Sequence, residues 1–254
     1  MNTRTLVKSE LKGDGKSEYI LGVDVARSED TSNNQTSVAV IKIKRAKGGR
    51  ITQLPLVNII NISNALNFNA QAVEVKRIKK LYNAKVVIVD TNGLGAGLLD
   101  KLLEDTTDPL TGESLGCWGT VNTDQVPEMD EYEEVVYDLK PQSANSEVII
   151  SFIDMVESGK LQLLEKRQFN DIDMMDKDAH LQRLPFINTD FLIEEIANLK
   201  LKQLPSGKYT VERLIKKYNK DRYSALAYAL WYIKVFEDVA YQENEDDIFD
   251  YLFM

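Results

Sequence analysis

The sequence predicts an α/β protein with a mixed central sheet flanked by helices on both faces. Three strands of antiparallel type come first, as short apolar or alternating runs separated by polar and glycine-containing segments. Strand–helix units follow, and this order is typical of parallel strands joined by helices. The 254 residues contain no internal repeat, so one domain is the simplest division.

The first three strands are expected over residues 19–25, 36–44 and 51–62. Residues 19–25 form an apolar run that contains one acid, whereas residues 36–44 alternate between apolar and polar side chains. Gly48 and Gly49 separate the second strand from the third, so residues 36–62 are predicted to form a hairpin.

The later elements follow from two patterns: apolar or alternating runs for strands, and apolar residues at helical spacing for helices. The β-branched run 85–90 is expected to be a central parallel strand and 117–121 a weaker strand, and 161–164 is a short apolar run. Apolar residues at helical spacing predict helices over 68–82, 93–103, 145–158, 189–199 and 221–239. Pro205-Ser206-Gly207 marks a turn between two short strands, and residues 167–188 are expected to be irregular.

Composition places the chain among intracellular globular proteins. No apolar run approaches the roughly 18 residues of a membrane span, and the start lacks the apolar core of a secretion signal. The single cysteine, Cys117, is expected in the core. Residues 1–17 are expected to be a flexible leader or linker remnant, 18–240 the domain, and 241–254 an acidic and aromatic tail.

Three aspartates stand where strands end or a helix begins, and a rigid frame there presents polar groups to solvent. Asp24 interrupts the first apolar run, Asp90 ends the run 86–89, and Asp221 starts the last helix. Each has a structural alternative: Asp90 and Asp221 suit a helix N-cap, and Asp24 suits an ion pair. Taken singly, the three residues leave both interpretations open.

Taken together, the three acids suit a metal site. If the strands that carry Asp24 and Asp90 are neighbours, their carboxylates lie side by side, and a helix crossing the sheet can deliver Asp221. Two carboxylates about 4 Å apart repel by roughly 4 kcal/mol at an effective dielectric constant near 20. Divalent cations remove this repulsion, and oxygen ligands select Mg²⁺ or Mn²⁺. Two such ions can activate a water and stabilise the leaving oxygen in phosphodiester cleavage.

The acidic motifs resemble those of the nuclease domain of tailed-bacteriophage terminase large subunits, a branch of the ribonuclease H-like superfamily. The matching segments are Gly22-Val23-Asp24-Val25-Ala26-Arg27-Ser28-Glu29-Asp30, Val87-Ile88-Val89-Asp90-Thr91-Asn92-Gly93-Leu94-Gly95 and Asn219-Lys220-Asp221-Arg222-Tyr223-Ser224-Ala225-Leu226-Ala227-Tyr228-Ala229. Together they span residues 19–232. The resemblance implies a ribonuclease H-like fold and a metal-dependent endonuclease that cuts double-stranded DNA with little sequence specificity during viral genome packaging.

The resemblance also implies roles for single residues. Asp24, Asp90 and Asp221 would be the catalytic residues and the ligands of two Mg²⁺ or Mn²⁺ ions, with Asp24 bridging both ions and the other two each completing one site. Asp30 matches a further acid of some members, six residues after the first, and is either a ligand, a neighbour of the ligands or a simple turn acid.

The chain departs from the family pattern just before the third motif. Many members have His or a second Asp there, where this chain has Asn219 and Lys220. This departure puts a histidine general base in doubt. The only histidine, His180, lies in an acidic segment outside the motifs and is expected to be incidental.

Charge distribution predicts where DNA binds. The formal net charge of −9 argues against general affinity for nucleic acid. Residues 200–222, however, hold eight basic side chains against two acidic ones. A solvated surface is the alternative to a DNA contact. The expected DNA-binding residues are Lys200, Lys202, Lys208, Arg213, Lys216, Lys217, Lys220 and Arg222.

Partners follow from the resemblance: an ATPase motor domain or chain, the portal and the small terminase subunit, in the host cytoplasm. No motor motif is visible. The segment Gly13-Asp14-Gly15-Lys16-Ser17 has Glu10 where a phosphate loop needs its first glycine. The glycines after Asp90 have Leu98 where a dinucleotide motif needs its third. The motor is therefore expected elsewhere.

Three other functions were weighed against the packaging nuclease. One is another ribonuclease H-like nuclease, of resolvase or transposase type. The second is a catalytically silent module that docks onto a packaging motor or portal through the acidic and aromatic tail. The third, an actin-like ATPase, needs more glycine-rich phosphate loops than this chain contains.

Overall fold

A mixed eight-stranded sheet runs through the described residues, 4–26, 35–167 and 177–238, of the computed structural model. Its strands, in the order in which they lie side by side, are β1 (Arg4–Val7), β10 (Leu161–Leu164), β4 (Ile51–Ile62), β3 (Thr36–Arg45), β2 (Glu18–Asp24), β5 (Val86–Asp90), β9 (Glu133–Leu139) and β8 (Trp118–Thr120). Strands β4, β3 and β2 are antiparallel, and the pairs on either side of them are parallel. The predicted mixed sheet is confirmed.

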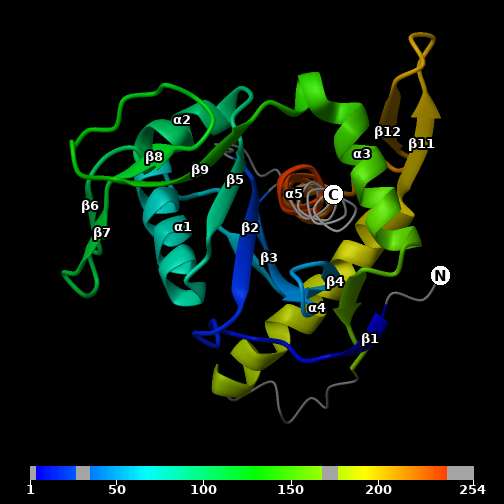
Figure 1. Ribbon diagram of the computed structural model, residues 1–254, viewed down its shortest axis with the longest axis horizontal. Helices are drawn as coiled ribbons and strands as arrows, with labels where there is room; N and C mark the ends of the chain where they lie inside the picture. Colours follow the sequence, from blue (N-terminus) through cyan, green and yellow to red (C-terminus); the bar gives the residue numbers. More distant parts are fainter. Residues whose placement is uncertain (1–3, 27–34, 168–176, 239–254) are drawn as a thin grey trace, which may run out of the picture.

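Helices cover both faces of this sheet (Figure 1). Helices α1 and α2 lie on one face, and α3, α4 and α5 lie on the other. The helices are α1 (Phe68–Tyr82), α2 (Leu94–Leu102), α3 (Pro141–Glu157), α4 (Lys177–Ala197) and α5 (Asp221–Tyr232), which continues as the π-helical η2 (Ile233–Asp238). Two small hairpins, β6 (Thr106–Thr107) with β7 (Ser114–Gly116) and β11 (Leu199–Gln203) with β12 (Tyr209–Arg213), stand outside the sheet.

Helix α5 is the innermost helix. From Tyr223 to Tyr232 every residue is buried, because the sheet lies on one side of the helix and α3 and α4 lie on the other. A helix that is apolar on all sides is expected to be buried in this way. Its position against β2 and β3 determines where its first residue, Asp221, points.

Strand β9 and the beginning of α4 differ from the sequence prediction. Strand β9 was missed, because its apolar pair Val135 and Val136 stands among acidic side chains. Residues 177–188 are helical rather than irregular: they form the first half of α4, which contains Pro185. The hydroxyl of Thr189 donates a 2.7 Å hydrogen bond to the carbonyl oxygen of Pro185, inside the helix.

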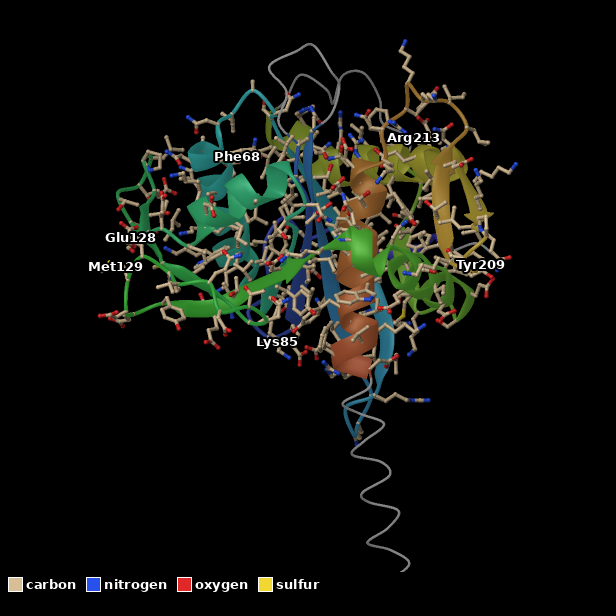
Figure 2. All side chains as sticks on the ribbon, turned by 90° about the horizontal axis from the view of Figure 1, so that it is seen from above. Phe68, Lys85, Glu128, Met129, Tyr209 and Arg213 are labelled. Atoms are coloured by element: carbon tan, nitrogen blue, oxygen red, sulfur yellow. The ribbon has the colours of Figure 1, made fainter. Side chains whose placement is uncertain are left out.

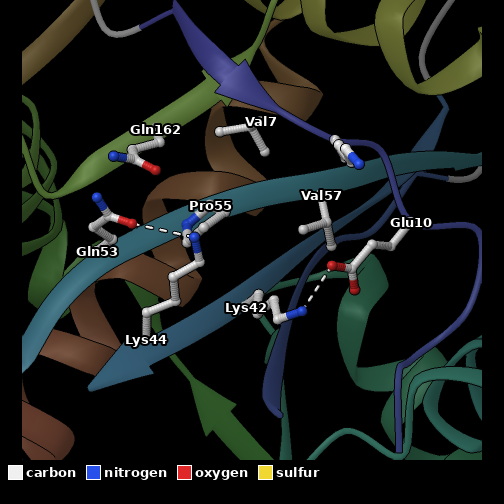
Figure 3. A pocket seen from close by; sticks show the side chains of 9 residues that line it. Val7, Glu10, Lys42, Lys44, Gln53, Pro55, Val57 and Gln162 are labelled. Carbon is white, nitrogen blue, oxygen red and sulfur yellow. Dashed lines mark hydrogen bonds and ion pairs between the residues drawn. The ribbon is translucent and has the colours of Figure 1, made fainter. Parts of the chain in front are cut away.

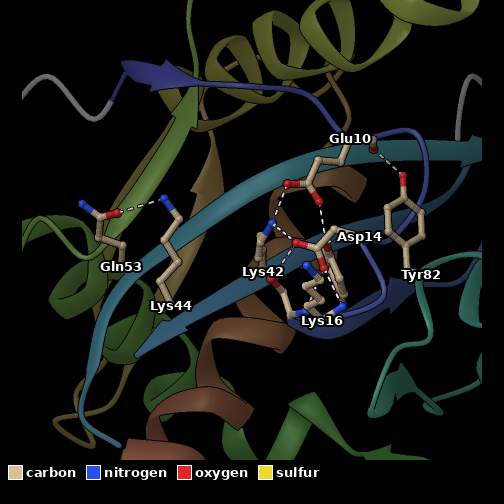
Figure 4. A network of polar contacts seen from close by, with 9 residues as sticks. Glu10, Asp14, Lys16, Lys42, Lys44, Gln53 and Tyr82 are labelled. Atoms are coloured by element: carbon tan, nitrogen blue, oxygen red, sulfur yellow. Dashed lines mark hydrogen bonds and ion pairs between the residues drawn. The ribbon is translucent and has the colours of Figure 1, made fainter. Parts of the chain in front are cut away.

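The expected flexible leader is instead attached to the sheet. Residues 4–7 form β1, and the residues after them cross β4 and β3 toward β2 (Figure 4). Lys42 of β3 forms ion pairs of 2.7 Å with both Glu10 and Asp14. Tyr82 donates a 2.6 Å hydrogen bond to the backbone oxygen of Glu10. The polar residues of this segment, which suggested mobility, form these ion pairs and this hydrogen bond. The predicted tail, residues 241–254, lies outside the described residues.

Candidate active site

Asp24 and Asp90 end two neighbouring parallel strands. Strands β2 and β5 pair with Val23 opposite Val89, so the two aspartates follow at the same end of the sheet. Successive side chains of a strand point to opposite faces. Since Val23 and Val89 belong to the core on the side of α1 and α2, Asp24 and Asp90 both point to the face that carries α5.

Helix α5 brings Asp221 to the same place. The helix lies directly on β2, because a Cβ added to Gly22 would stand 2.0 Å from the carbonyl oxygen of Ala225. Asp221 is one turn earlier, at the start of α5. Its Oδ2 accepts a 3.1 Å hydrogen bond from the backbone of Gln35, which directly precedes β3. The start of α5 therefore lies beside the end of β2, where Asp24 is.

The turn after Asp90 depends on glycine. A Cβ at Gly95 would stand 1.7 Å from the carbonyl oxygen of Asp90, so no other residue fits as α2 begins. Gly93 has a φ of +60°, which L side chains rarely adopt. The backbone N–H of Asn92 donates a 2.9 Å hydrogen bond to Asp90 Oδ1. The second motif thus fixes the carboxylate that it carries.

Burial raises the pKa of all three carboxyl groups. The pKa of Asp24 lies well above its ordinary value of 3.8, because the negative charges of Asp221 and Asp90 add to the effect of burial. The positive charge of Lys220 lowers the pKa of each of the three. Its ammonium group, however, donates a 3.0 Å hydrogen bond to the hydroxyl of Ser224 rather than pairing with one of them.

The three carboxylates suit a divalent metal by their chemistry, although they do not yet form a closed ligand set. Asp24 is partly buried and accepts no hydrogen bond from the described residues. Desolvating a carboxylate without a partner is costly unless a cation binds it. In the parts of the chain that the structure describes, no three His, Cys, Asp or Glu side chains lie close enough to hold an ion as they stand.

Tyr228 is a site residue to which the sequence assigned no role. It lies two turns after Asp221 on α5, and its hydroxyl donates a 3.1 Å hydrogen bond to Asp90 Oδ2. Burial, together with the charges of Asp24 and Asp90, raises the pKa of Tyr228, so the hydroxyl keeps its proton. The sequence could have indicated Tyr228 by its spacing, because residues seven apart on a helix share a face and Tyr228 follows Asp221 by seven.

Glu195 of α4 is a second site residue that the sequence did not indicate. It is 4% exposed, and its charge raises the pKa of Asp24. Its Oε1 forms a 2.7 Å ion pair with Arg222, and its Oε2 accepts a 3.0 Å hydrogen bond from the backbone of Tyr223. Nothing in its neighbourhood of the sequence distinguishes it from the exposed Glu194, since only packing decides which of the two is buried.

The basic residues of the predicted DNA-binding set fall into two groups. Most are exposed on the β11–β12 hairpin and the turn that follows, where Arg213 lies in Figure 2. Arg222, in contrast, is 16% exposed and is paired with Glu195. Lys220 is partly buried beside the three acids. The exposed members are Lys200, Lys202, Lys208, Arg213, Lys216 and Lys217.

Three other residues were singled out in the sequence: Cys117, His180 and Asp30. Cys117 is buried, as predicted, and its thiol lies 2.9 Å from the carbonyl oxygen of Leu103. His180 is exposed on α4. Asp30 lies outside the described residues, so its expected role stays a prediction.

A groove of about 460 Å³ lies between the N-terminal segment and the sheet, apart from the three acids (Figure 3). The side chains of Lys42 and Lys44 reach into it from β3, and Lys44 contacts Gln53 at 3.2 Å. It is lined by Val7, Lys8, Glu10, Lys42, Lys44, Gln53, Pro55, Val57 and Gln162. None of these residues was predicted to be functional.

The mixed sheet with helices on both faces has the ribonuclease H-like fold. Among solved structures, the chain is similar to the large terminase nuclease from thermophilic phage G20c, with 15% identity and a TM-score of 0.51 over 90% of this chain and 88% of that chain. A structure of the G20c nuclease with bound magnesium gives 16% identity and a TM-score of 0.51 over 91% and 87% of the two chains.

The large terminase nuclease domain of Thermus phage P74-26 is similar to the same degree, with 15% identity and a TM-score of 0.50 over 89% of this chain and 90% of that chain. No protein-family model and no curated protein sequence matches the chain. The predicted resemblance to terminase nuclease domains is thus confirmed as a likeness of fold.

Proposed function

We propose that this chain is a divalent-metal-dependent endonuclease that cuts double-stranded DNA, with little sequence specificity, during viral genome packaging. The observation that carries the proposal is the meeting of Asp24, Asp90 and Asp221 at one end of a sheet with the terminase nuclease fold. The G20c nuclease, which has this fold, binds magnesium in one of its structures.

The three acids would hold two Mg²⁺ or Mn²⁺ ions. Asp24, whose pKa responds to both of the other carboxylates, would bridge the ions, and Asp90 and Asp221 would each complete one site. When bound, such a pair of ions activates a water and stabilises the leaving oxygen of the phosphodiester. Because ligands bind metal in the deprotonated form, the raised pKa values of the acids would make metal binding weaken as the pH falls.

The residues around the acids would orient them. The hydroxyl of Tyr228 and the backbone of Asn92 each hold one oxygen of Asp90. The backbone of Gln35 holds one oxygen of Asp221. The charge of Lys220 offsets part of the repulsion among the three acids. These contacts would restrict how the carboxyl groups of Asp90 and Asp221 rotate.

DNA would reach this site along the β11–β12 hairpin. Its exposed cations stand just before Asp221 in the chain and suit contacts to phosphates, which position a duplex without reading its sequence. We leave Arg222 out of the proposed contacts because Glu195 holds it. Lys220 is retained, since it lies beside the acids that would face the scissile phosphate.

In a packaging complex this chain would work in the host cytoplasm with an ATPase motor, a portal and a small terminase subunit. The part of the chain that the structure describes contains no helix that is long and apolar enough to span a membrane.

Cleavage of supercoiled plasmid with Mg²⁺, with Mn²⁺ and with chelator tests the proposal. We expect the wild type to nick and linearise plasmid with either metal and to stop in chelator. Asp24→Ala and Asp90→Ala should abolish cleavage while the circular dichroism spectrum stays unchanged. Asp100→Ala, which removes an exposed carboxylate from α2, is the matched control and should cut at the wild-type rate.

Each other outcome excludes the proposal in a definite way. Undiminished cleavage by purified Asp24→Ala protein would overturn the assignment of the site. Cleavage of branched DNA but not of plain duplex would indicate a resolvase-type enzyme on this fold. A wild type that binds a motor or portal protein and cuts no DNA under any metal condition would be a docking module.

A further inference from the structure

Helix α5 begins without a side-chain cap of its own. The residue at the N-cap position is Lys220, whose ammonium group can only donate hydrogen bonds, and it forms no capping bond. The first amides of a helix have no acceptor within the helix and need one from outside. Glu195 of α4 supplies it, since its Oε2 accepts the hydrogen bond of the Tyr223 amide.

The same carboxylate also holds Arg222. The ion pair is 2.7 Å long, and the exposed fractions of the two side chains are 16% for Arg222 and 5% for Glu195. The guanidinium group of Arg222 lies 5.1 Å from the centre of the Phe191 ring, one turn before Glu195 on α4. The Glu195 carboxylate therefore binds both residues that follow Asp221: the side chain of Arg222 and the backbone amide of Tyr223.

Asn198, in the turn after α4, fixes the beginning of the segment that leads to α5. Its Oδ1 accepts a 2.8 Å hydrogen bond from the Ile215 amide, and its Nδ2 donates a 3.0 Å bond to the Ile215 carbonyl. Its backbone oxygen accepts a 2.8 Å bond from the Leu214 amide. The end of α4 thus holds the chain on both sides of residues 216–221.

From these contacts we propose that Glu195 is a positioning residue for Asp221: by capping α5 and holding Arg222, it fixes the third carboxylate in the place where metal would bind. This inference rests on the proposed function. Glu195 reaches Asp221 through its neighbours rather than by touching the metal. A negative charge near the N-terminus of α5 further stabilises this arrangement.

Loss of a residue that orients a ligand commonly weakens metal binding by about 10- to 100-fold. We therefore expect Glu195→Gln to bind Mn²⁺ at least about 10-fold more weakly, with the number of bound ions unchanged. At saturating Mn²⁺ its cleavage rate should return close to that of the wild type. Glu194→Gln, the same change on the exposed neighbouring residue, is the control and should leave Mn²⁺ affinity unchanged.

The measurement is titration calorimetry with Mn²⁺ on the whole chain without DNA, together with amide hydrogen exchange of residues 221–224. Exchange at these amides should be faster in Glu195→Gln and unchanged in Glu194→Gln. Arg222→Met, which removes the partner and keeps the carboxylate, should reproduce part of the loss of affinity. In the double variant the two losses should be less than additive, because both act through one ion pair.

Three results would overturn the proposal. Glu195→Gln with wild-type affinity and exchange would mean that the contact only contributes to folding. Loss of one bound ion in Glu195→Gln, but not in Arg222→Met, would make Glu195 a direct ligand. Weakened Mn²⁺ binding in Glu195→Gln with normal exchange at 221–224 would mean that Glu195 affects metal binding without holding the start of α5.

Failure of the proposed function gives a different pattern. A wild type that neither binds Mn²⁺ nor cuts DNA would remove the nuclease assignment, whereas hydrogen exchange would still show whether Glu195 holds the start of α5. If Glu195→Gln does not fold, Arg222→Met alone decides: wild-type affinity and exchange in that variant would overturn the proposal.

Discussion

Among the described residues, none near Asp24 in the chain makes a contact that accounts for its place at the end of a buried strand. It caps no helix, and it accepts no hydrogen bond from the described residues. Its pKa is raised by burial and by the neighbouring acids. A carboxyl group whose pKa is higher in the folded protein than in the unfolded chain takes stability away as the pH rises past its ordinary value of 3.8.

We expect Asp24→Asn to raise the free energy of unfolding in the presence of chelator, because it removes a buried charge and keeps the shape. The gain should be largest near pH 7 and should vanish below about pH 3, where the wild-type carboxyl is protonated in both the folded and the unfolded state. Each gain of about 1 kcal/mol corresponds to roughly 2–4 °C in Tm for a domain of this size. Thermal melts from about pH 3 to pH 8 in chelator measure the gain, and a gain that grows toward acid pH contradicts the prediction.

Tyr228 provides a one-atom test of how Asp90 is held. In Tyr228→Phe the ring still fills its place, but Asp90 Oδ2 loses the donated hydrogen bond. We expect the Mn²⁺ concentration for half-maximal cleavage to rise by about 10-fold, with a small change in Tm. Tyr232→Phe, on the same helix but packed against Tyr137, is the control and should cut like the wild type. An unchanged metal requirement in Tyr228→Phe would show that Asp90 does not need this contact.

At the scale of whole elements, the placing of Asp221 depends on how closely α5 approaches β2. The approach is possible because β2 carries glycine at position 22, where a Cβ would stand 2.0 Å from a backbone oxygen of α5. Backbone atoms of a buried helix cannot move aside singly, so a side chain there displaces the helix. The helix carries Asp221 at one end and Tyr228 in its middle, so both residues would move relative to Asp24 and Asp90 on the sheet.

Gly22→Ala should therefore reduce both stability and cleavage. Overpacking costs about 1–3 kcal/mol and sometimes more, which corresponds to a fall in Tm of roughly 2–12 °C. Gly119→Ala in β8 is the matched control, because its Cβ would meet the partly exposed ring of Tyr132, which can turn away. Differential scanning calorimetry and the plasmid assay compare the two. If Gly22→Ala and Gly119→Ala reduced stability and cleavage equally, the close approach of α5 to β2 would not account for the effect of Gly22→Ala.

Element prediction from the sequence worked where periodicity was strong. The hairpin of β3 and β4, the helix α1 and the strand β5 were predicted nearly to their ends, since each is a long apolar pattern. Strand β9 and the first half of α4 were missed, because their acidic residues and Pro185 mask the pattern. These elements are stabilised by neighbours rather than by their own composition.

At the scale of the whole molecule, charge is unevenly distributed. The net charge of the chain is −9. In Figure 2 the hairpin with Arg213 and the loop with Glu128 lie on opposite sides of the molecule. A polyanion would approach the hairpin side, near the three acids. Each phosphate contact contributes about −0.9 to the slope of log affinity against log salt, so four to six contacts give roughly −4 to −5.

Lys216→Glu with Lys217→Glu should weaken duplex binding and reduce the magnitude of this slope by about 2. Fluorescence anisotropy with a short duplex in Ca²⁺, over a range of salt concentrations, measures both. The control is the pair Lys8→Glu and Lys12→Glu, which makes the same change of charge on the exposed N-terminal segment. If Lys8→Glu with Lys12→Glu reduces the slope and Lys216→Glu with Lys217→Glu does not, DNA binds along the N-terminal segment and not along the β11–β12 hairpin.

Sequence by itself determined the class of fold and the three acids. Strand and helix patterns depend on neighbours within a few residues, so they can be read along the chain. Asp24, Asp90 and Asp221 were visible because each is an acid at the end of a regular element, in a motif with family resemblance. Only the structure brings the three to one face of one sheet end.

The tertiary structure alone decided which side chains surround these acids. Glu195 and Glu194 are the same residue type side by side, and only the packing of α4 buries the first against Arg222. The attachment of the N-terminal segment through Lys42 likewise depends on side chains far apart in the chain. Periodicity records which face of an element is buried, but a contact between two elements depends on how they pack, and no local pattern contains that information.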